Sequence, residues 1–303
     1  MAIARALTLA ENDDHDKENL IDILFRHGGQ ALVLGVTGAP GSGKSTLVNQ
    51  LISAYRRLDS KVAVIAVDPS SPFSGGALLG DRVRMQQHAT DDKVFIRSMA
   101  SRGHLGGVAR ATADGIKILD AAGYDIIIIE TIGVGQTEIE VTRMADIILL
   151  VLMPGTGDEI QVLKAGIMEI GDIFVINKSD RPDAAKLAAE VKYMLQMSKR
   201  QKDQPVLMTS ALHAQGIPEL ASAIESYYRH ITATGVLNEK QKLRLAQEIR
   251  TIMRDRIEAT VTNRVALEEN MDQWVTLLFD RVESPYGLIR KKIDPVLIKG
   301  NPS

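Results

Sequence analysis

Short apolar runs alternate with longer segments of helical spacing along the chain as far as residue 235. The runs are rich in Val and Ile and nearly continuous, which is typical of strands buried on both faces of a parallel sheet. The segments between them, such as Ala184–Lys199, place apolar residues at helical intervals. This alternation predicts βαβ units and an α/β fold, with a mostly parallel sheet flanked by helices. The predicted strands are Ala31–Thr37, Lys61–Val67, Val94–Arg97, Asp125–Glu130, Ile147–Met153, Ile173–Asn177 and Pro205–Ser210.

The pattern changes after residue 235. No Gly or Pro occurs from Glu239 to Glu283, and apolar residues recur there at helical spacing between charges, which predicts long amphipathic helices. These helices either pack on the flank of the sheet domain or form a dimerisation arm, and periodicity favours neither. Ser284–Pro295 is predicted as a turn and a short tail, and Leu20–Phe25 as a helix covering the sheet edge. The predicted domains are an N-terminal helical segment (1–30), a nucleotide-binding domain (31–235) and a C-terminal helical extension (236–303).

Composition excludes several classes of protein. The 303 residues are 45% hydrophobic and 24% charged, with a net charge of −2, so wholesale binding to nucleic acid is not expected. The absence of cysteine excludes disulfides and thiolate metal sites. Acidic residues occur too early for a signal or transit peptide, and the longest apolar run, Ile147–Met153, is too short to cross a bilayer. We expect a cytoplasmic protein with neither nucleic-acid nor membrane partners.

The stretch GVTGAPGSGKSTLVNQL, residues 35–51, places a glycine-rich loop between a predicted strand and a predicted helix. It fits the phosphate-loop pattern G-x-x-x-x-G-K-[ST], in which backbone N–H groups and the helix N-terminus surround phosphate oxygens. Lys44 is expected to bridge the β- and γ-phosphates, and the Ser45 hydroxyl to ligate Mg²⁺. The predicted phosphate-binding residues are Gly38, Ala39, Pro40, Gly41, Ser42, Gly43, Lys44, Ser45 and Thr46.

Two further loops predict which base is bound. Asp180, in the Asn-Lys-Ser-Asp sequence after the sixth strand, can accept hydrogen bonds from the ring N–H and the exocyclic amine of guanine, a donor pair that adenine lacks. Lys178 can cover the base, Asn177 can tie its loop to the phosphate loop, and the Ala211 N–H can reach the guanine carbonyl oxygen. The order of these loops favours GTP over ATP. The predicted base-binding residues are Asn177, Lys178, Asp180, Ser210, Ala211 and Leu212.

A third group of residues predicts the metal site. Glu130 ends an apolar strand, where its carboxylate can hold Mg²⁺ or a water bound to it, and the Gly133 N–H can meet the γ-phosphate. Asp68 and Asp81 flank a Gly/Ser/Pro-rich loop and supply two more carboxylates. We expect Mg²⁺ to draw its ligands from Ser45, Asp68, Asp81 and Glu130, though not from all of them at once.

The predicted hydrolytic site is incomplete. Residue 134, where many GTPases place a Gln that orients water, is Val, and Gln136 lies two residues further on. The sequence therefore predicts slow intrinsic hydrolysis of GTP to GDP that needs a partner protein to complete the site.

Four segments together are similar to a known family. VDPSSPFSGGALLGDR, RSMASRGHLGG, ETIGVGQTE and PGTGDEIQVLKAGIMEIGDIFVINKSD resemble the methylmalonyl-CoA mutase-associated GTPases of the MeaB/ArgK type, which belong to the metallocentre-assembly class of phosphate-loop GTPases. The resemblance runs from about Ala4 to Ser210, with weaker support through the C-terminal helices.

The resemblance implies a chaperone for an adenosylcobalamin-dependent acyl-CoA mutase, which gates cofactor loading and protects or reactivates the mutase. It also implies a homodimer held by the C-terminal helices, and it assigns metal positions to Asp68, Asp81 and Glu130. Gly155–Lys164 would be a switch that responds to the partner, with Lys164 lending positive charge at the nucleotide. Lys44, Glu130 and Lys164 are therefore the expected catalytic residues.

Three alternatives remain open. A nickel-delivery or cobalamin-biosynthesis GTPase usually brings Cys or His ligand sets, which the absence of cysteine and the scattered histidines disfavour. A phosphotransferase would agree with an older ArgK kinase label, although no catalytic base near an acceptor pocket is evident. A structural dimer could bind GTP without turnover. The sequence does not distinguish methylmalonyl-CoA, isobutyryl-CoA and 2-hydroxyisobutyryl-CoA mutases as clients.

Overall fold

The structure is a computed structural model that describes residues 2–12, 16–68, 86–88, 90–100, 107–131, 144–155, 169–197 and 204–298. The chain divides into two compact units, Met1–Asn238 and Glu239–Ser303. We describe each unit by itself.

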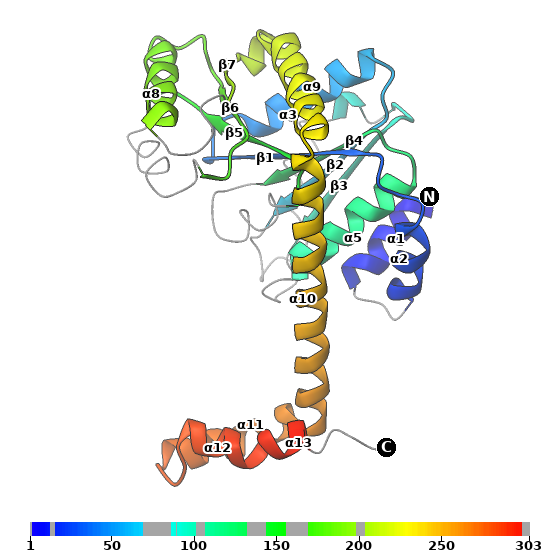
Figure 1. The fold of residues 1–303 in the computed structure, drawn as a ribbon, viewed down its shortest axis with the longest axis vertical. Helices are drawn as coiled ribbons and strands as arrows, with labels where there is room; N and C mark the ends of the chain where they lie inside the picture. Colours follow the sequence, from blue (N-terminus) through cyan, green and yellow to red (C-terminus); the bar gives the residue numbers. More distant parts are fainter. Residues whose placement is uncertain are drawn as a thin grey trace. The chain divides into compact units, whose positions relative to one another are not determined.

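The first unit is built on a parallel sheet of seven strands (Figure 1). The strand order is β3-β2-β4-β1-β5-β6-β7, and all six neighbouring pairs run parallel. All seven predicted strands are present, and the predicted α/β fold is confirmed. The strands are β1 (Leu32–Gly38), β2 (Val62–Asp68), β3 (Val94–Ala100), β4 (Ile126–Thr131), β5 (Ile147–Leu152), β6 (Ile173–Ile176) and β7 (Val206–Met208).

Helices cover both faces of this sheet, because the central strands are mostly apolar and are buried along their whole length. Every residue of β1, β4 and β5 is buried, so neither face of these strands can be left to solvent. Alternate side chains enter separate cores on the two faces. One face carries α3 (Lys44–Arg57) and α9 (Ile217–Ala233), and the other carries α1 (Ala2–Asn12), α5 (Gly107–Ala121) and α8 (Ala184–Met197).

The N-terminal segment forms two helices that pack on α5. The helix expected near Leu20–Phe25 is present as α2 (Lys17–Phe25), whereas α1 was not predicted. Leu7 of α1 is fully buried against α5, and Glu11 forms an ion pair with Arg97 of β3. The chain between α2 and β1 is fixed by Asp120 of α5, whose carboxylate accepts the N–H groups of residues 29–31.

Aspartates occupy the amino ends of three strands of the sheet, β4, β5 and β6. Each aspartate is the residue immediately before its strand. Its carboxylate accepts a backbone N–H from the neighbouring strand, or from the residue that immediately precedes that neighbouring strand. The backbone N–H of the same aspartate donates to the carbonyl of that same residue. The three pairs are Asp125 with Lys61, Asp146 with Val33 and Asp172 with Ile148, with N–H to carboxylate distances of 2.7, 3.0 and 2.9 Å.

The second unit is helical, as the absence of Gly and Pro predicted. It is made by α10 (Val236–Arg264), which begins in the first unit, and by α11 (Leu267–Phe279), α12 (Pro285–Lys292) and α13 (Asp294–Ile298). The predicted turn and short tail over residues 284–295 is wrong, because Ser284 caps α12. Its hydroxyl accepts the Gly287 N–H at 3.0 Å, and Pro285 occupies the first turn, where its missing N–H costs no helical hydrogen bond. Among the described helices, none is long and apolar enough to cross a membrane.

Candidate nucleotide-binding site

The glycine-rich loop joins β1 to α3, as the motif requires. β1 ends at Gly38 and α3 begins at Lys44. Gly38 and Gly43 have φ values of +150° and +90°, which residues with a side chain rarely adopt. A Cβ atom at Gly38 would collide with the Val151 carbonyl oxygen, and one at Gly43 would collide with the Asn177 amide nitrogen. Both glycines therefore let the loop approach its neighbours more closely than any other residue would allow.

The Lys44 side chain folds back onto the backbone of this loop. Its Nζ donates to the carbonyl oxygens of Gly38 at 2.8 Å and Ala39 at 3.1 Å, and the residue is buried. The ammonium is thus held beside the loop by its own backbone. Phosphate oxygens placed in the loop would be stronger acceptors for the same charge, because charge-assisted hydrogen bonds to anions are the stronger kind.

Ser45 and Glu130 meet although 85 residues separate them in sequence. The Ser45 hydroxyl donates to Glu130 Oε1 at 2.5 Å, and Glu130 is only 3% exposed. Parallel pairing places Glu130 of β4 opposite Val36 of β1 and Ala66 of β2, so the sheet fixes its position beside the loop. A hydroxyl and a carboxylate are hard oxygen donors that suit Mg²⁺.

Of the other residues predicted to bind the metal or the γ-phosphate, the structure describes only the backbone of Asp68. Asp68 ends β2, which pairs with β4, so its backbone lies at the same sheet edge as Glu130. Asp81, Gly133 and Lys164 lie outside the described residues, as do residues 134 and 136.

Asn177 joins three loops. Its Nδ2 donates to the Ser42 carbonyl oxygen at 2.8 Å, which forms the expected tie to the phosphate loop. Its Oδ1 accepts the Ala211 N–H at 3.0 Å and the Thr209 hydroxyl at 3.2 Å, and the residue is 2% exposed. The hydrogen bond from Thr209 to Asn177 was not predicted, although Thr209 begins the Thr-Ser-Ala-Leu loop and its hydroxyl could have suggested such a bond. Because the Ala211 N–H already has an acceptor, a guanine carbonyl oxygen would share it with Asn177.

Asp180 is oriented by Ser210. The Ser210 hydroxyl donates to Asp180 Oδ1 at 2.6 Å, and this hydrogen bond is the main cause that holds the pKa of Asp180 below its usual value. The carboxylate therefore stays charged, as the two guanine donors need. Leu212 follows in a short 3₁₀ helix, Ala211–His213, with its side chain exposed at the site.

Lys178 adopts a left-handed backbone conformation, with φ of +57°, which is uncommon for a residue with a side chain. Its Nζ lies 3.3 Å from the sulfur of Met153, and Arg181 donates to the Pro154 carbonyl oxygen at 3.4 Å. These contacts connect the base loop to the end of β5. Sequence reasoning did not find them, because no motif marks Met153 or Arg181.

The described parts of the site all lie at the carboxyl ends of the sheet strands. The phosphate loop follows β1, Glu130 ends β4, and the two base loops follow β6 and β7. Ligands of open parallel sheets bind at this edge. The arrangement can therefore hold a nucleotide with its phosphates at the centre of the sheet and its base over β6 and β7.

Comparisons with known proteins identify relatives of the chain by fold and by sequence. A crystal structure named as a LAO/AO transport system kinase matches with a TM-score of 0.70 and 28% identity, covering 97% of this chain and 92% of that one. The GTPase ArgK of Escherichia coli is 40% identical over 284 residues, which is 90% of this chain and 84% of the relative. The mitochondrial methylmalonic aciduria type A homolog of Mus musculus is 36% identical over 260 residues, which is 79% of this chain and 63% of the relative.

The family comparison covers most of the chain. The sequence model described as "Methylmalonyl Co-A mutase-associated GTPase MeaB" matches residues 3–266, which include every described part of the site. The protein binds guanine nucleotides and is a GTPase with a phosphate-loop fold. The chain belongs to the MeaB family of methylmalonyl-CoA mutase-associated GTPases.

Proposed function

We propose that this protein is a GTP-dependent chaperone of an adenosylcobalamin-dependent acyl-CoA mutase, acting in the cytoplasm. The match of residues 3–266 to a family described by its association with methylmalonyl-CoA mutase carries this proposal. The relative named for methylmalonic aciduria type A supports the same context. The protein would gate cofactor loading and protect or reactivate the mutase, with its nucleotide state setting the affinity between the two proteins.

The residues of the site have separable roles in this proposal. Lys44 and the loop amides bind the β- and γ-phosphates, and Asp180 selects guanine while Ser210 keeps it charged. Asn177 holds the phosphate and base loops together. Mg²⁺ fits the oxygen donors Ser45 and Glu130, with Asp68 and Asp81 as further candidates, and when bound it would neutralise charge on the phosphates.

Intrinsic hydrolysis is proposed to be slow because Val134 replaces the water-orienting Gln of many GTPases. The partner would complete the site, and Lys164 is proposed to lend positive charge at the nucleotide when the mutase binds. Gly133 would meet the γ-phosphate with its N–H. These three positions carry the proposed difference between resting and stimulated rates.

The experiment is a GTPase assay with and without each candidate mutase: methylmalonyl-CoA, isobutyryl-CoA and 2-hydroxyisobutyryl-CoA mutase. We expect a large stimulation by one mutase, and Lys164→Ala should remove the stimulation while leaving the resting rate unchanged. Equal responses to all three mutases, or none to any, would contradict a dedicated chaperone. Partner regulation that survives Lys44→Ala would instead indicate a structural role for the nucleotide.

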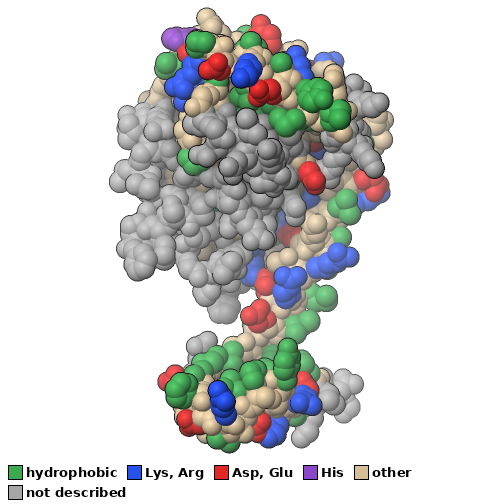
Figure 2. Space-filling view, turned by 90° about the vertical axis from the view of Figure 1, so that its left-hand side faces the viewer, with side chains coloured by type: hydrophobic (Ala, Val, Ile, Leu, Met, Phe, Trp, Pro, Cys, Tyr) green, Lys and Arg blue, Asp and Glu red, His purple; other side chains and the backbone are tan. Residues whose placement is uncertain are grey.

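The C-terminal helical unit is proposed to be a dimerisation arm, within a three-part chain of residues 1–30, 31–235 and 236–303. Hydrophobic side chains lie exposed on the C-terminal helices (Figure 2). On α10 they follow helical spacing along one stripe, and a continuous exposed apolar stripe is typical of an interaction surface. The members of this stripe are 42–65% exposed: Leu245, Ile249, Ile252, Met253 and Ile257.

Sedimentation equilibrium tests the arm. Replacing Ile249 and Ile257 with Asp should convert a dimer into monomers, because two carboxylates would then face the apolar stripe of the second copy. Thr251→Asp is the matched control, since residue 251 lies on the opposite side of the helix and is exposed. A parent chain that sediments as a monomer, or a double variant that stays dimeric, would contradict the arm.

A phosphotransferase is the second candidate, because the matching crystal structure is named as a kinase. The base-selecting groups of this chain also permit GTP as a phosphate donor. Incubation with γ-labelled GTP separates the two functions. Label that appears only in inorganic phosphate supports hydrolysis, whereas label transferred to an amino acid or a protein would support the kinase.

A further inference from the structure

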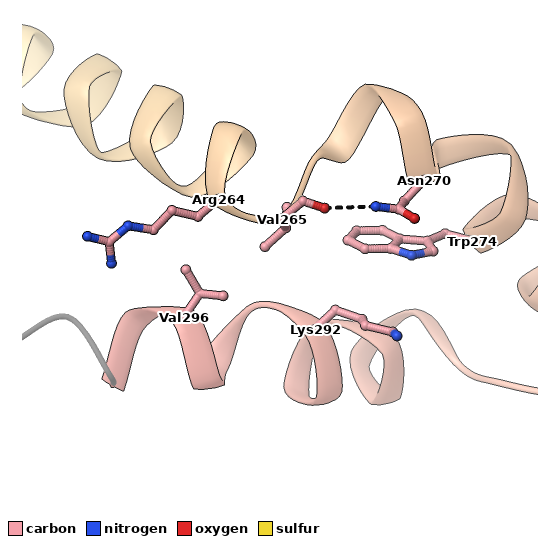
Figure 3. Close-up of a pocket in the computed structure, with 6 residues that line it drawn as sticks. All are labelled: Arg264, Val265, Asn270, Trp274, Lys292 and Val296. Carbon is pink, nitrogen blue, oxygen red and sulfur yellow. Dashed lines mark hydrogen bonds between the residues drawn. The ribbon is translucent and has the colours of Figure 1, made fainter.

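A pocket of about 220 Å³ lies within the C-terminal unit, far along the chain from the nucleotide site. Figure 3 shows its two walls: the junction of α10 and α11 forms one, and α12 with α13 forms the other. No carboxylate lines it within the part of the chain that the structure describes. The lining residues are Arg264, Val265, Asn270, Trp274, Lys292 and Val296.

The α10–α11 wall is fixed by its own hydrogen bonds. The chain turns at Ala266, which adopts a left-handed conformation with φ of +45°. Asn270 stabilises this turn, since its Nδ2 donates to the carbonyl oxygens of Val265 at 3.0 Å and Ala266 at 3.1 Å. Trp274 is 6% exposed, although most large apolar side chains described in this unit are exposed. This wall of the pocket is therefore held by contacts within the protein itself.

The charges of the pocket are unbalanced. Among the described residues, neither Arg264 nor Lys292 forms an ion pair, whereas the adjacent Lys291 pairs with Glu283. In Figure 3 Arg264 extends toward one end of the pocket and Lys292 toward the other, with Val265 and Val296 between them and the indole of Trp274 beside Lys292. A ligand that satisfies this lining carries an anion at one end and an apolar body that reaches the middle.

We propose that this pocket binds a small organic carboxylate with a short apolar chain. The carboxylate pairs with Arg264 or Lys292, and the chain contacts the two valines and the indole. Pockets for drug-sized ligands are typically about 300–1,000 Å³, so a volume of about 220 Å³ suits a smaller molecule. A bare inorganic anion would leave the apolar wall uncovered, and a neutral apolar molecule would gain no charge-assisted hydrogen bond from either cation.

The single tryptophan of the chain, Trp274, reports directly on this pocket. The full chain is saturated with GDP to keep the nucleotide site constant, and Trp274 fluorescence is followed during titration with hexanoate, hexanamide or inorganic phosphate. We expect a saturable change with hexanoate and at least about tenfold weaker binding of the amide and of phosphate. No saturable response to hexanoate, or an equal response to hexanamide or phosphate, would overturn the proposal.

Charge variants test the residues. One of the two single variants, Arg264→Gln or Lys292→Gln, removes the cation that pairs with the carboxylate, and that variant should weaken hexanoate binding about tenfold. The double variant should abolish binding. Arg254→Gln is the matched control, because it removes the same charge from an exposed site on α10 ten residues before Arg264. Equal weakening by Arg254→Gln would show non-specific attraction and refute a site. Circular dichroism and GDP affinity check that each variant is folded.

Discussion

Replacement of Asn177 by Ala should separate the loops that form the nucleotide site. The substitution removes three hydrogen bonds at a residue that is 2% exposed: one to the Ser42 carbonyl, and one each from Thr209 and Ala211. At about 0.5–1.5 kcal/mol for each bond, the free energy of unfolding should fall by about 3 kcal/mol. In a unit of this size, that loss corresponds to a decrease in Tm of about 6–12 °C.

The assay combines thermal unfolding, followed by circular dichroism, with titration of a fluorescent GDP analogue. Thr209→Val is the comparison, because it removes only one donor and should cost about 1 kcal/mol. The two losses share one bond, so the double variant should be less destabilised than their sum by about 1 kcal/mol. If Asn177→Ala unfolds within 2 °C of the parent, or if the losses add fully, then Asn177 does not hold these loops together.

Three further predictions concern single groups. Gly43→Ala should weaken GDP binding at least about tenfold, because the new Cβ collides with the neighbouring amide; unchanged affinity would contradict this. Asp120→Ala should lower stability by about 1–3 kcal/mol in urea unfolding, since the N–H groups of residues 29–31 lose their acceptor, and Asp120→Asn should lose less. Ser210→Ala should raise the pKa of Asp180. A depressed pKa keeps the carboxylate charged until pH falls through the folded value, so the acidic loss of GDP affinity should move to higher pH, and an unmoved profile would contradict the role of Ser210.

Much of the first unit was predictable because its signals are local. Each strand is a compact apolar run, and the phosphate loop has a fixed pattern between a strand and a helix, so both could be found without knowing any long-range contact. The helix α1 was missed because its burial depends on α5, more than 100 residues away in sequence. Periodicity in a short helix does not reveal which surface covers it.

The types of residue that form the site could be predicted from the sequence, but the hydrogen bonds between them were harder to predict. The tie between Asn177 and the phosphate loop was expected, whereas the bonds from Thr209 and Ser210 depend on how β6 and β7 align. The turn and short tail predicted for residues 284–295 are wrong, although Pro and Gly are common turn residues. Pro285 and Gly287 instead lie in the first turn of a helix capped by Ser284, where both are tolerated.

The aspartates at the amino ends of the strands have a consequence for the pairing register. A strand buried on only one face specifies its register, because a slip of one residue would expose its apolar side chains. The fully buried strands β1, β4 and β5 lack that safeguard, since either alignment presents apolar residues to both cores. Each of the three aspartates, Asp125, Asp146 and Asp172, forms hydrogen bonds to both the N–H and the carbonyl of one residue on the adjacent chain segment. If a strand slipped by one residue, the carboxylate would face a different backbone group and lose these bonds. Three polar residues thus specify an alignment that the apolar ones leave ambiguous.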